Sequence, residues 1–480
     1  MKWETVIGLE IHVELDTKTK IFCQCPTTFG ASPNHHTCPV CMGLPGTLPV
    51  LNQAVVEMAV RAGLALGCEI QMVSKMDRKN YFYPDLPKAY QISQYDLPIC
   101  TNGAVEIDVE GRKKTIRVHR IHIEEDAGKL IHDEYEPVSY IDYNRVGVPL
   151  IEIVSEADMR SPKEAVAYVR AVRAILQYAG ISDCRMEQGS LRCDGNISIR
   201  PFGQKELNAK VELKNINSFR ELQKALEKEE KRQGELYSFE EGHKVIQETR
   251  RWDAAKGRTV SMRSKEDAHD YRYFPEPDLK PILIQKTEVD RIRGELPELP
   301  AVKAERFRKM YHLVEKEIDI LISEKALSLF YEETVEMGAH PKVAANWILG
   351  DLLRYLNEQD MEAEDLRIKP EQLAALVRLV DQGTISGTMG KEVFGVMVDT
   401  GRNPETIVEE AGMKQISGTD ELSEIILRVL AANPTSVKDY HSGKKQALGF
   451  LMGQVMKATG GQANPKMAKE MLEDKLQQET

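Results

Sequence analysis

The sequence has no long hydrophobic run, no low-complexity tract and no excess of positive charge. None of its 480 residues falls in a segment approaching the roughly 18 apolar residues of a membrane helix. The formal net charge of -11 argues against general polyanion binding, so nucleic acid would have to bind through local basic patches. The N-terminal MKWETVIG leads almost directly into an alternating pattern, so we expect no secretory signal and a cytoplasmic protein.

Standard nucleotide-binding and metalloprotease motifs are also missing. HSGKKQAL contains Gly-Lys but lacks the Walker glycine spacing and the Ser or Thr after the lysine. No G-x-G-x-x-G follows a predicted strand, and no H-E-x-x-H occurs. No Ser/Lys amidase centre is evident either. A catalytic site in this chain must therefore be built differently.

The segment ETVIGLEIHVEL (4–15) alternates strictly between apolar and other residues, which predicts a strand with one buried face. The second face carries Glu10, His12 and Glu14 instead of ordinary surface residues. Residues two apart on a strand lie about 6.6 Å apart on one face, so Glu10 and His12 could flank one ion. We interpret Glu14 as structural.

The same alternation recurs in SLRCDGNISIRP (190–201) and AKVELKN (209–215), while HRIHIEEDAGK brings His122, Glu124, Glu125 and further polar residues close together in sequence. A solvated sheet face is the plainer interpretation of any single strand. Together, however, neighbouring strands would add Asp194 and Glu212 to Glu10 and His12. Mixed carboxylate and imidazole ligands suit Mg²⁺ or Mn²⁺, and Zn²⁺ is also allowed. Four interleaved cations would suit a phosphorylated ligand: Arg192, Arg200, Lys210 and Lys214.

Four of the eight cysteines form a C-x-C and a C-x-x-C separated by twelve residues: Cys23, Cys25, Cys38 and Cys41. Four thiolates can close a tetrahedral Zn²⁺ site without an open position, so the metal would be structural. The alternatives are free thiols, a redox pair, or replacement of one thiol by His35 or His36. In a reducing cytosol we favour the zinc knuckle.

Composition changes along the chain predict an α+β fold with three parts. Residues 1–295 are rich in short alternating segments, with helices expected at 161–180 and 217–233. The proline-containing segment 295–311 is predicted to be a linker. Beyond it the pattern is almost wholly helical, which indicates a helical domain at 296–404 and a small helical tail domain at 405–480.

Several long segments of the chain resemble the B subunits of the bacterial aspartyl/glutamyl-tRNA amidotransferases. The resemblance runs in order and register through the first 295 residues and continues in NWILGDLLRYLN and ISGTMGKEVF. The segments that carry it most strongly are YIDYNRVGVPLIEIVSE, VIGLEIHVEL, DRKNYFYPDLPKAYQISQYD, HIEEDAGK, EQGSLRCDGNISIRP, ELKNINSF and DYRYFPEPD.

This resemblance implies an antiparallel-sheet cradle as the first domain, and a ligase activity. Glu on tRNA(Gln) or Asp on tRNA(Asn) would be phosphorylated by ATP on its side-chain carboxylate, and ammonia would displace the phosphate. The ammonia would come from glutamine in a partner amidase, the family's A subunit. A small protein, the family's C subunit, would complete the heterotrimer.

The resemblance also implies site residues. The family's Mg²⁺–ATP ligands match Glu10, His12, Glu125, Asp194 and Glu212, and charge stabilisation is expected from Lys79, Arg192 and Lys210. The zinc knuckle is expected in only part of the family, so its loss need not abolish the chemistry.

The tail domain is expected to contact tRNA. Residues 434–480 hold seven lysines against five acidic residues, a mild basic bias compatible with RNA contact.

Three other functions compete with this one. The first is that of the family's archaeal paralogue, which acts only on Glu-tRNA(Gln). That subunit carries an inserted synthetase-like domain, for which residues 296–404 leave no room. A zinc-stabilised tRNA-binding scaffold without catalysis, or a metallohydrolase acting alone, remains open.

Overall fold

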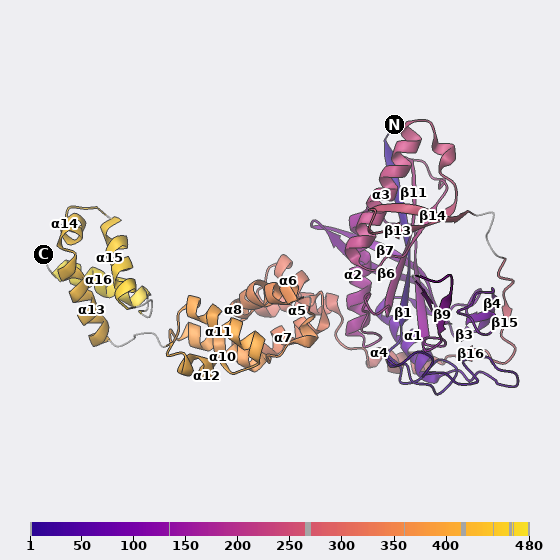
Figure 1. Cartoon of the computed structure of the whole chain (residues 1–480), viewed down its shortest axis with the longest axis horizontal. Coiled ribbons are helices and arrows are strands. Elements are labelled where there is room, and N and C mark those ends of the chain that lie inside the picture. The colour runs from indigo at the N-terminus through magenta and orange to yellow at the C-terminus, as the bar shows by residue number, and fades with distance from the viewer. Residues whose placement is uncertain are drawn as a thin grey trace. The chain divides into compact units, whose positions relative to one another are not determined.

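A computed structural model describes residues 2–133, 135–264, 270–359, 361–413, 419–444, 446–459, 463 and 465–478 (Figure 1). The chain divides into two compact units, Met1–Lys303 and Ala304–Thr480. The domain limits predicted at 295 and 404 stay predictions. No described helix is both long enough and apolar enough to cross a membrane.

The first unit is built on a nine-stranded sheet, which confirms the α+β prediction. Neighbouring strands run antiparallel except β12 and β13, which pair in parallel. In spatial order the strands are β14 (Arg258–Ser264), β13 (Glu248–Asp253), β12 (Val211–Lys214), β11 (Leu191–Pro201), β1 (Trp3–Glu14), β10 (Pro149–Ser155), β7 (Arg112–Glu125), β6 (Cys100–Val109) and β2 (Glu69–Ile70).

Strand β1 lies at the centre of this sheet and confirms the predicted alternation. Ile7, Leu9, Ile11 and Val13 are almost completely buried and belong to the main hydrophobic core. Burying four large aliphatic side chains on one face stabilises the strand and fixes its register, because a slip by one residue would expose all of them. The other face is left to Glu10, His12 and Glu14.

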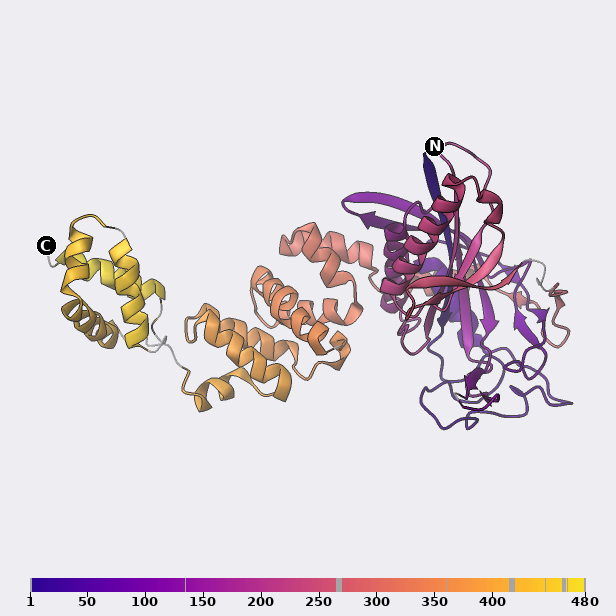
Figure 2. The same ribbon diagram turned by 45° about the horizontal axis from the view of Figure 1, so that its top comes forward.

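Helices cover the apolar face of the sheet, where Figures 1 and 2 show α2 (Pro162–Tyr178) and α3 (Phe219–Ser238) side by side. The Ser161 hydroxyl accepts a hydrogen bond from the Glu164 amide at 3.2 Å, so it caps α2, whose predicted position is confirmed. Ser218 caps α3 in the same way. The remaining α-helices of the sheet unit are α1 (Gln53–Ala65) and α4 (Lys286–Gly294).

Three small sheets lie beside the main one, on the side away from α2 and α3 (Figure 1). They bring segments distant in sequence together, since β15 pairs with β4 and β16 with β3. Their strands are β3 (Val73–Ser74), β4 (Asp77–Asn80), β5 (Tyr90–Ser93), β8 (Lys129–His132), β9 (Ser139–Asp142), β15 (Phe274–Pro275) and β16 (Ile282–Leu283).

The second unit is helical throughout its described residues, as predicted, and holds two hydrophobic cores, from Phe307 to Val408 and from Leu422 to Leu476. The predicted linker at 295–311 is wrong for most of its length: Pro300 begins a helix, because proline is tolerated in the first turn. The helices from there on are α5 (Pro300–Tyr311), α6 (Glu315–Ile322), α7 (Lys325–Glu336), α8 (Pro341–Trp347), α9 (Leu353–Gln359), α10 (Pro370–Asp381), α11 (Gly387–Thr400), α12 (Pro404–Glu410), α13 (Thr419–Ala432), α14 (Pro434–His441), α15 (Gln446–Ala458) and α16 (Pro465–Gln478).

Candidate functional site

The polar face of the main sheet is a grid of side chains set by strand register. His12 on β1 lies opposite Arg192 on β11 and opposite Glu152 on β10. Glu152 in turn lies opposite His122 on β7. Paired residues point to the same face, so this row crosses four strands without interruption. In a second row, Glu10 lies opposite Asp194.

Two histidines and two glutamates form a compact cluster on this face, which we call the His12 cluster: His12, His122, Glu124 and Glu152. His12 Nε2 lies 3.3 Å from Glu124 Oε1 and 3.5 Å from Glu152 Oε2. His122 Nε2 lies 3.0 Å from Glu152 Oε2. Ligand atoms of His12, Glu124 and Glu152 all lie within 4.8 Å of one another, close enough to hold one cation.

The side chains of the His12 cluster are largely removed from water, and both burial and their mutual charges shift their pKa values. Burial opposes ionisation of Glu124 and Glu152, but the contacts of His12 and His122 hold the pKa of both carboxyls below its usual range. For His12, burial opposes the charged form, yet Glu152 and Glu124 raise its pKa above the usual value. The buried carboxylates are therefore stabilised in their charged form by nearby positive charge, which either protonated imidazoles or a bound cation can supply.

Three predicted ligands lie next to this cluster: Glu10 on β1 itself, Asp194 on β11 and Glu212 on β12. Glu10 accepts a hydrogen bond from Asn196 Nδ2 at 3.0 Å. Burial, and then the charges of Glu152 and Glu212, raise the pKa of Glu10. Lys214 pairs with Asp194 and lies 3.1 Å from Glu212. The structure thus brings Glu10, Asp194 and Glu212 together beside His12.

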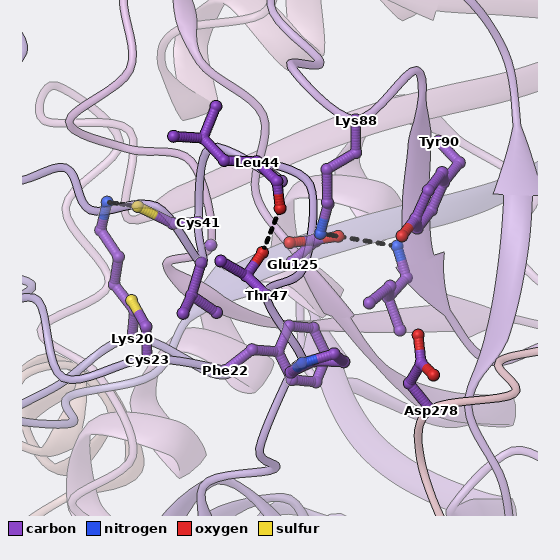
Figure 3. Close-up of a pocket in the computed structure, with 15 residues that line it drawn as sticks. Lys20, Phe22, Cys23, Cys41, Leu44, Thr47, Lys88, Tyr90, Glu125 and Asp278 are labelled. Atoms are coloured by element: carbon purple, nitrogen blue, oxygen red, sulfur yellow. Dashed lines mark hydrogen bonds and ion pairs between the residues drawn. The ribbon is translucent and has the colours of Figure 1, made fainter.

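Glu125, the fifth predicted ligand, lies elsewhere, and Glu124 takes its place in the geometry. Successive strand residues point to opposite faces, so Glu125 shares the core-facing side of β7 with Ile123. Its carboxylate pairs with Lys88 and accepts a hydrogen bond from the Ile92 amide at 2.8 Å. Glu125 lines a cavity of about 70 Å³ to which no residue of the His12 cluster contributes. Figure 3 shows Glu125 there with Lys88 and Tyr90.

The predicted cations have three different surroundings. Arg192 donates to Asp126 Oδ2 at 2.7 Å, so its charge is largely neutralised within the chain. Lys79 on β4 lies over two aromatic rings, 5.6 Å from the centroid of Tyr81 and 4.9 Å from that of Tyr271. Lys210 is exposed, two residues before Glu212.

Sequence reasoning placed His122 and Glu124 near other polar residues but missed Glu152 entirely. A signal was present, because Glu152 stands between the apolar residues Ile151 and Ile153 in an alternating segment. What the sequence alone could not supply is the pairing of β10 between β1 and β7, which puts Glu152 beside His12.

The four cysteines of the predicted knuckle converge, with their sulfur atoms all within 4.8 Å of one another. The Cys38 amide donates to Cys41 Sγ at 3.1 Å, and Lys20 Nζ lies 3.9 Å from the same sulfur. The hydrogen bond from Cys23 lowers the pKa of Cys41 to about 5. A thiolate among converging sulfurs is the donor set of a closed zinc site.

Comparisons with known proteins show to which family this chain is similar. Residues 5–290 match the family model described as "GatB/GatE catalytic domain", and residues 329–476 match the "GatB domain" model. A curated relative from Clostridium beijerinckii, named as the B subunit of an aspartyl/glutamyl-tRNA(Asn/Gln) amidotransferase, is 61% identical over 476 residues, covering 99% of each chain. Relatives with the same type of name from Clostridium acetobutylicum and Thermoanaerobacter pseudethanolicus are 59% and 57% identical, each over 99% of this chain and the whole of its own.

Proposed function

The chain belongs to the family of B subunits of the aspartyl/glutamyl-tRNA(Asn/Gln) amidotransferases, and on that premise we propose that its polar sheet face activates a carboxylate carried by tRNA. The substrate would be Glu on tRNA(Gln), Asp on tRNA(Asn), or both. ATP would phosphorylate the side-chain carboxylate, and ammonia would convert the acyl phosphate to the amide. The single observation that carries this proposal is the His12 cluster, where two carboxylates meet His12 within 3.5 Å.

The two steps balance without a nucleophile from the protein. In the first, an oxygen of the substrate carboxylate attacks the γ-phosphorus of ATP, and the bond to ADP breaks with its electron pair. In the second, the nitrogen of ammonia attacks the acyl carbon, phosphate leaves, and the nitrogen loses a proton. Catalysis then consists mainly of positioning and charge neutralisation, which suits a rigid polar sheet face.

The side chains present fit a divalent cation. His12, Glu124 and Glu152 would hold it, with Glu10, Asp194 and Glu212 available beside them. Carboxylate oxygens with one imidazole are a donor set for Mg²⁺ or Mn²⁺. When bound, such a cation neutralises phosphate charge and aligns the reacting oxygens. Glu125 is not part of this proposed set, since it binds Lys88 on the other face.

The chain's own cations would hold the anionic substrates in place. Arg192 would orient Asp126, to which it donates a hydrogen bond, while Lys79 remains available for a phosphate oxygen beside the rings of Tyr81 and Tyr271. Lys210 lies at the exposed margin and is the least supported of the three.

The remaining parts would serve assembly and RNA binding. The cysteine knuckle would hold a structural Zn²⁺ that orders the loop between β1 and α1. The helical tail would contact tRNA. Ammonia would come from a partner amidase, the A subunit of the complex, and a small C subunit would complete the heterotrimer.

The test is a transamidation assay on Glu-tRNA(Gln) and Asp-tRNA(Asn) with ATP, Mg²⁺ and either glutamine or free ammonia. We expect the chain in complex with its partners to form the amide from either nitrogen source. With ammonia, the chain should also show ATP cleavage that requires the aminoacyl-tRNA. Absence of such cleavage from the complex contradicts the proposal.

A scaffold without catalysis is the second candidate, favoured by the converging cysteines. Substituting Glu10→Ala or Asp194→Ala separates the two functions. A scaffold would keep amide formation intact in the reconstituted complex, whereas a catalytic face would lose it. Binding of tRNA by these variants serves as the control for assembly.

A further inference from the structure

An irregularity in strand β7 turns two consecutive side chains away from the core. The register between β10 and β7 shifts after Val154, which pairs with Arg120. Val118 is buried in the core before the shift and Ile121 after it, although the two are an odd number of residues apart. A β-bulge accounts for this, because the extra residue leaves both His119 and Arg120 on the outer face.

The bulge places Arg120 on the same face as the His12 cluster. Arg120 precedes His122 by two residues on β7, a separation of about 6.6 Å. Across the sheet, Arg120 lies opposite Val154, and Val154 lies opposite Glu10. Two strand spacings separate Arg120 from Glu10, or roughly 10 Å, and the guanidinium can span much of that distance. One polyphosphate can therefore reach both the carboxylates and Arg120.

Arg120 differs from the neighbouring cations in its electrostatic surroundings. Across the residues that the structure describes, its side chain has no ion pair, and its Nε, like that of Arg192, is buried without a hydrogen-bond partner. Arg192, by contrast, pairs with Asp126, and Lys214 pairs with Asp194. A buried donor without a partner costs free energy, and the planar guanidinium suits the oxygens of a phosphate.

A second cation, Lys79, borders the same region. Lys79 Nζ lies 4.9 Å from the ring centroid of Tyr271. The Tyr271 ring is 6.1 Å from that of Tyr273. Burial and then the charge of Glu124 raise the pKa of Tyr273, while Arg120 acts in the opposite direction. The two tyrosines thus connect Lys79 to the neighbourhood of Arg120.

We infer that Arg120 is a phosphate-binding residue of the nucleotide site, contacting the transferred phosphoryl group from the β7 side of the polar sheet face. This inference rests on the proposed function. During the transfer, the P–O bond to ADP breaks while the bond to the substrate carboxylate forms, and the equatorial oxygens keep their negative charge throughout. Arg120 would donate to those oxygens, as Lys79 would from the direction of the tyrosines.

The test uses the full-length chain in complex with its partner subunits and compares Arg120→Gln, Arg120→Lys and a matched control, Arg117→Gln. Arg117 lies on the same strand, is exposed, and pairs with Asp158 at 2.7 Å. Three quantities are measured: binding of the non-hydrolysable analogue Mg²⁺–AMP-PNP by calorimetry, the KM values for ATP and for aminoacyl-tRNA in tRNA-dependent ATP cleavage, and the melting temperature.

We expect Arg120→Gln to weaken AMP-PNP binding and raise the KM for ATP by roughly 10- to 100-fold, with the KM for aminoacyl-tRNA unchanged. Arg120→Lys should recover part of the loss, and Arg117→Gln should match the wild type. Unchanged AMP-PNP binding by a folded Arg120→Gln or Arg120→Lys complex overturns the inference, as does an equal rise of both KM values. Failure of the wild-type complex to cleave ATP would instead refute the proposed function.

Discussion

The His12 cluster and the cysteine knuckle both bring potential metal ligands within 4.8 Å of one another, yet they are built in opposite ways. The ligands of the cluster stand on β1, β7 and β10, three neighbouring strands of one sheet. The cysteines stand in the loop between β1 and α1, where Phe29 and Val50 are exposed. A hydrogen-bonded ladder over a buried core positions its ligands before any ion arrives, whereas a loop without a core depends on the ion for its order.

This difference assigns separate tasks to the two groups. A preorganised site can lower a barrier, because the free energy of arranging its ligands is supplied by folding. A closed tetrahedral thiolate site has no open position for a substrate and contributes only stability. Substitutions in the His12 cluster should therefore affect amide formation more than stability. Substitutions in the cysteine knuckle should affect stability more than amide formation.

The largest effect is expected from His12→Ala. His12 contacts both Glu124 and Glu152, so its removal takes away a proposed ligand and leaves the two buried carboxylates with His122 beside them. We expect tRNA-dependent amide formation to fall on the order of 100-fold or more, while the core-facing side of β1 keeps its packing. Amide formation is measured with ammonia as the nitrogen source.

The matched control for this variant is His132→Ala, on the β8–β9 hairpin, where His132 Nδ1 lies 2.8 Å from the Ser139 hydroxyl. Its activity should equal that of the wild type. Equal activities of His12→Ala and His132→Ala would show that the His12 cluster takes no part in the reaction.

The opposite face of the same strand should show the reverse behaviour. Leu9 is 1% exposed and lies within the main core, so Leu9→Ala leaves a cavity beneath the sheet. We expect a loss of about 2–5 kcal/mol in the free energy of unfolding, measured by denaturant titration. At a temperature where the variant is folded, Mg²⁺ affinity should change little. A large loss of Mg²⁺ affinity without destabilisation would contradict the division between the two faces.

The smallest effect on catalysis is expected at the knuckle. Cys41→Ser removes one of the four converging thiols, so bound zinc should fall from one ion per chain to none, measured by elemental analysis. Proteolysis between residues 23 and 50 should become faster, while amide formation changes less than about tenfold. Cys184→Ala, at a buried thiol outside the knuckle, is the control and should retain zinc. A loss of activity as large as that of His12→Ala would make the knuckle part of the catalytic site.

The same contrast explains which features the sequence could predict. Alternation identified β1 and its two faces, and cysteine spacing identified the knuckle, because both are local patterns. The pairing of β10 beside β1 is not local, and it brings Glu152 to His12. The choice between Glu124 and Glu125 depends on which side of β7 faces the core, which the bulge near Arg120 resets.

The helical part shows a similar limit. Proline at 297 and 300 suggested a linker, but Pro300 opens α5 because proline fits the first helical turn. Composition alone does not distinguish a proline that ends a helix from one that begins it. The helical pattern predicted beyond that segment is confirmed, in contrast, and in α13 Leu422 and Ile426 are buried at the spacing of one helical face.

The most direct test of the central claim is Mn²⁺ binding, followed by electron paramagnetic resonance, in Glu124→Gln and Glu125→Gln. The two residues are adjacent in sequence but face opposite sides of β7, so each variant is the control for the other. We predict that Glu124→Gln loses the bound Mn²⁺ signal and that Glu125→Gln keeps it. Retention by Glu124→Gln together with loss by Glu125→Gln would contradict the assignment of the metal site to the His12 cluster.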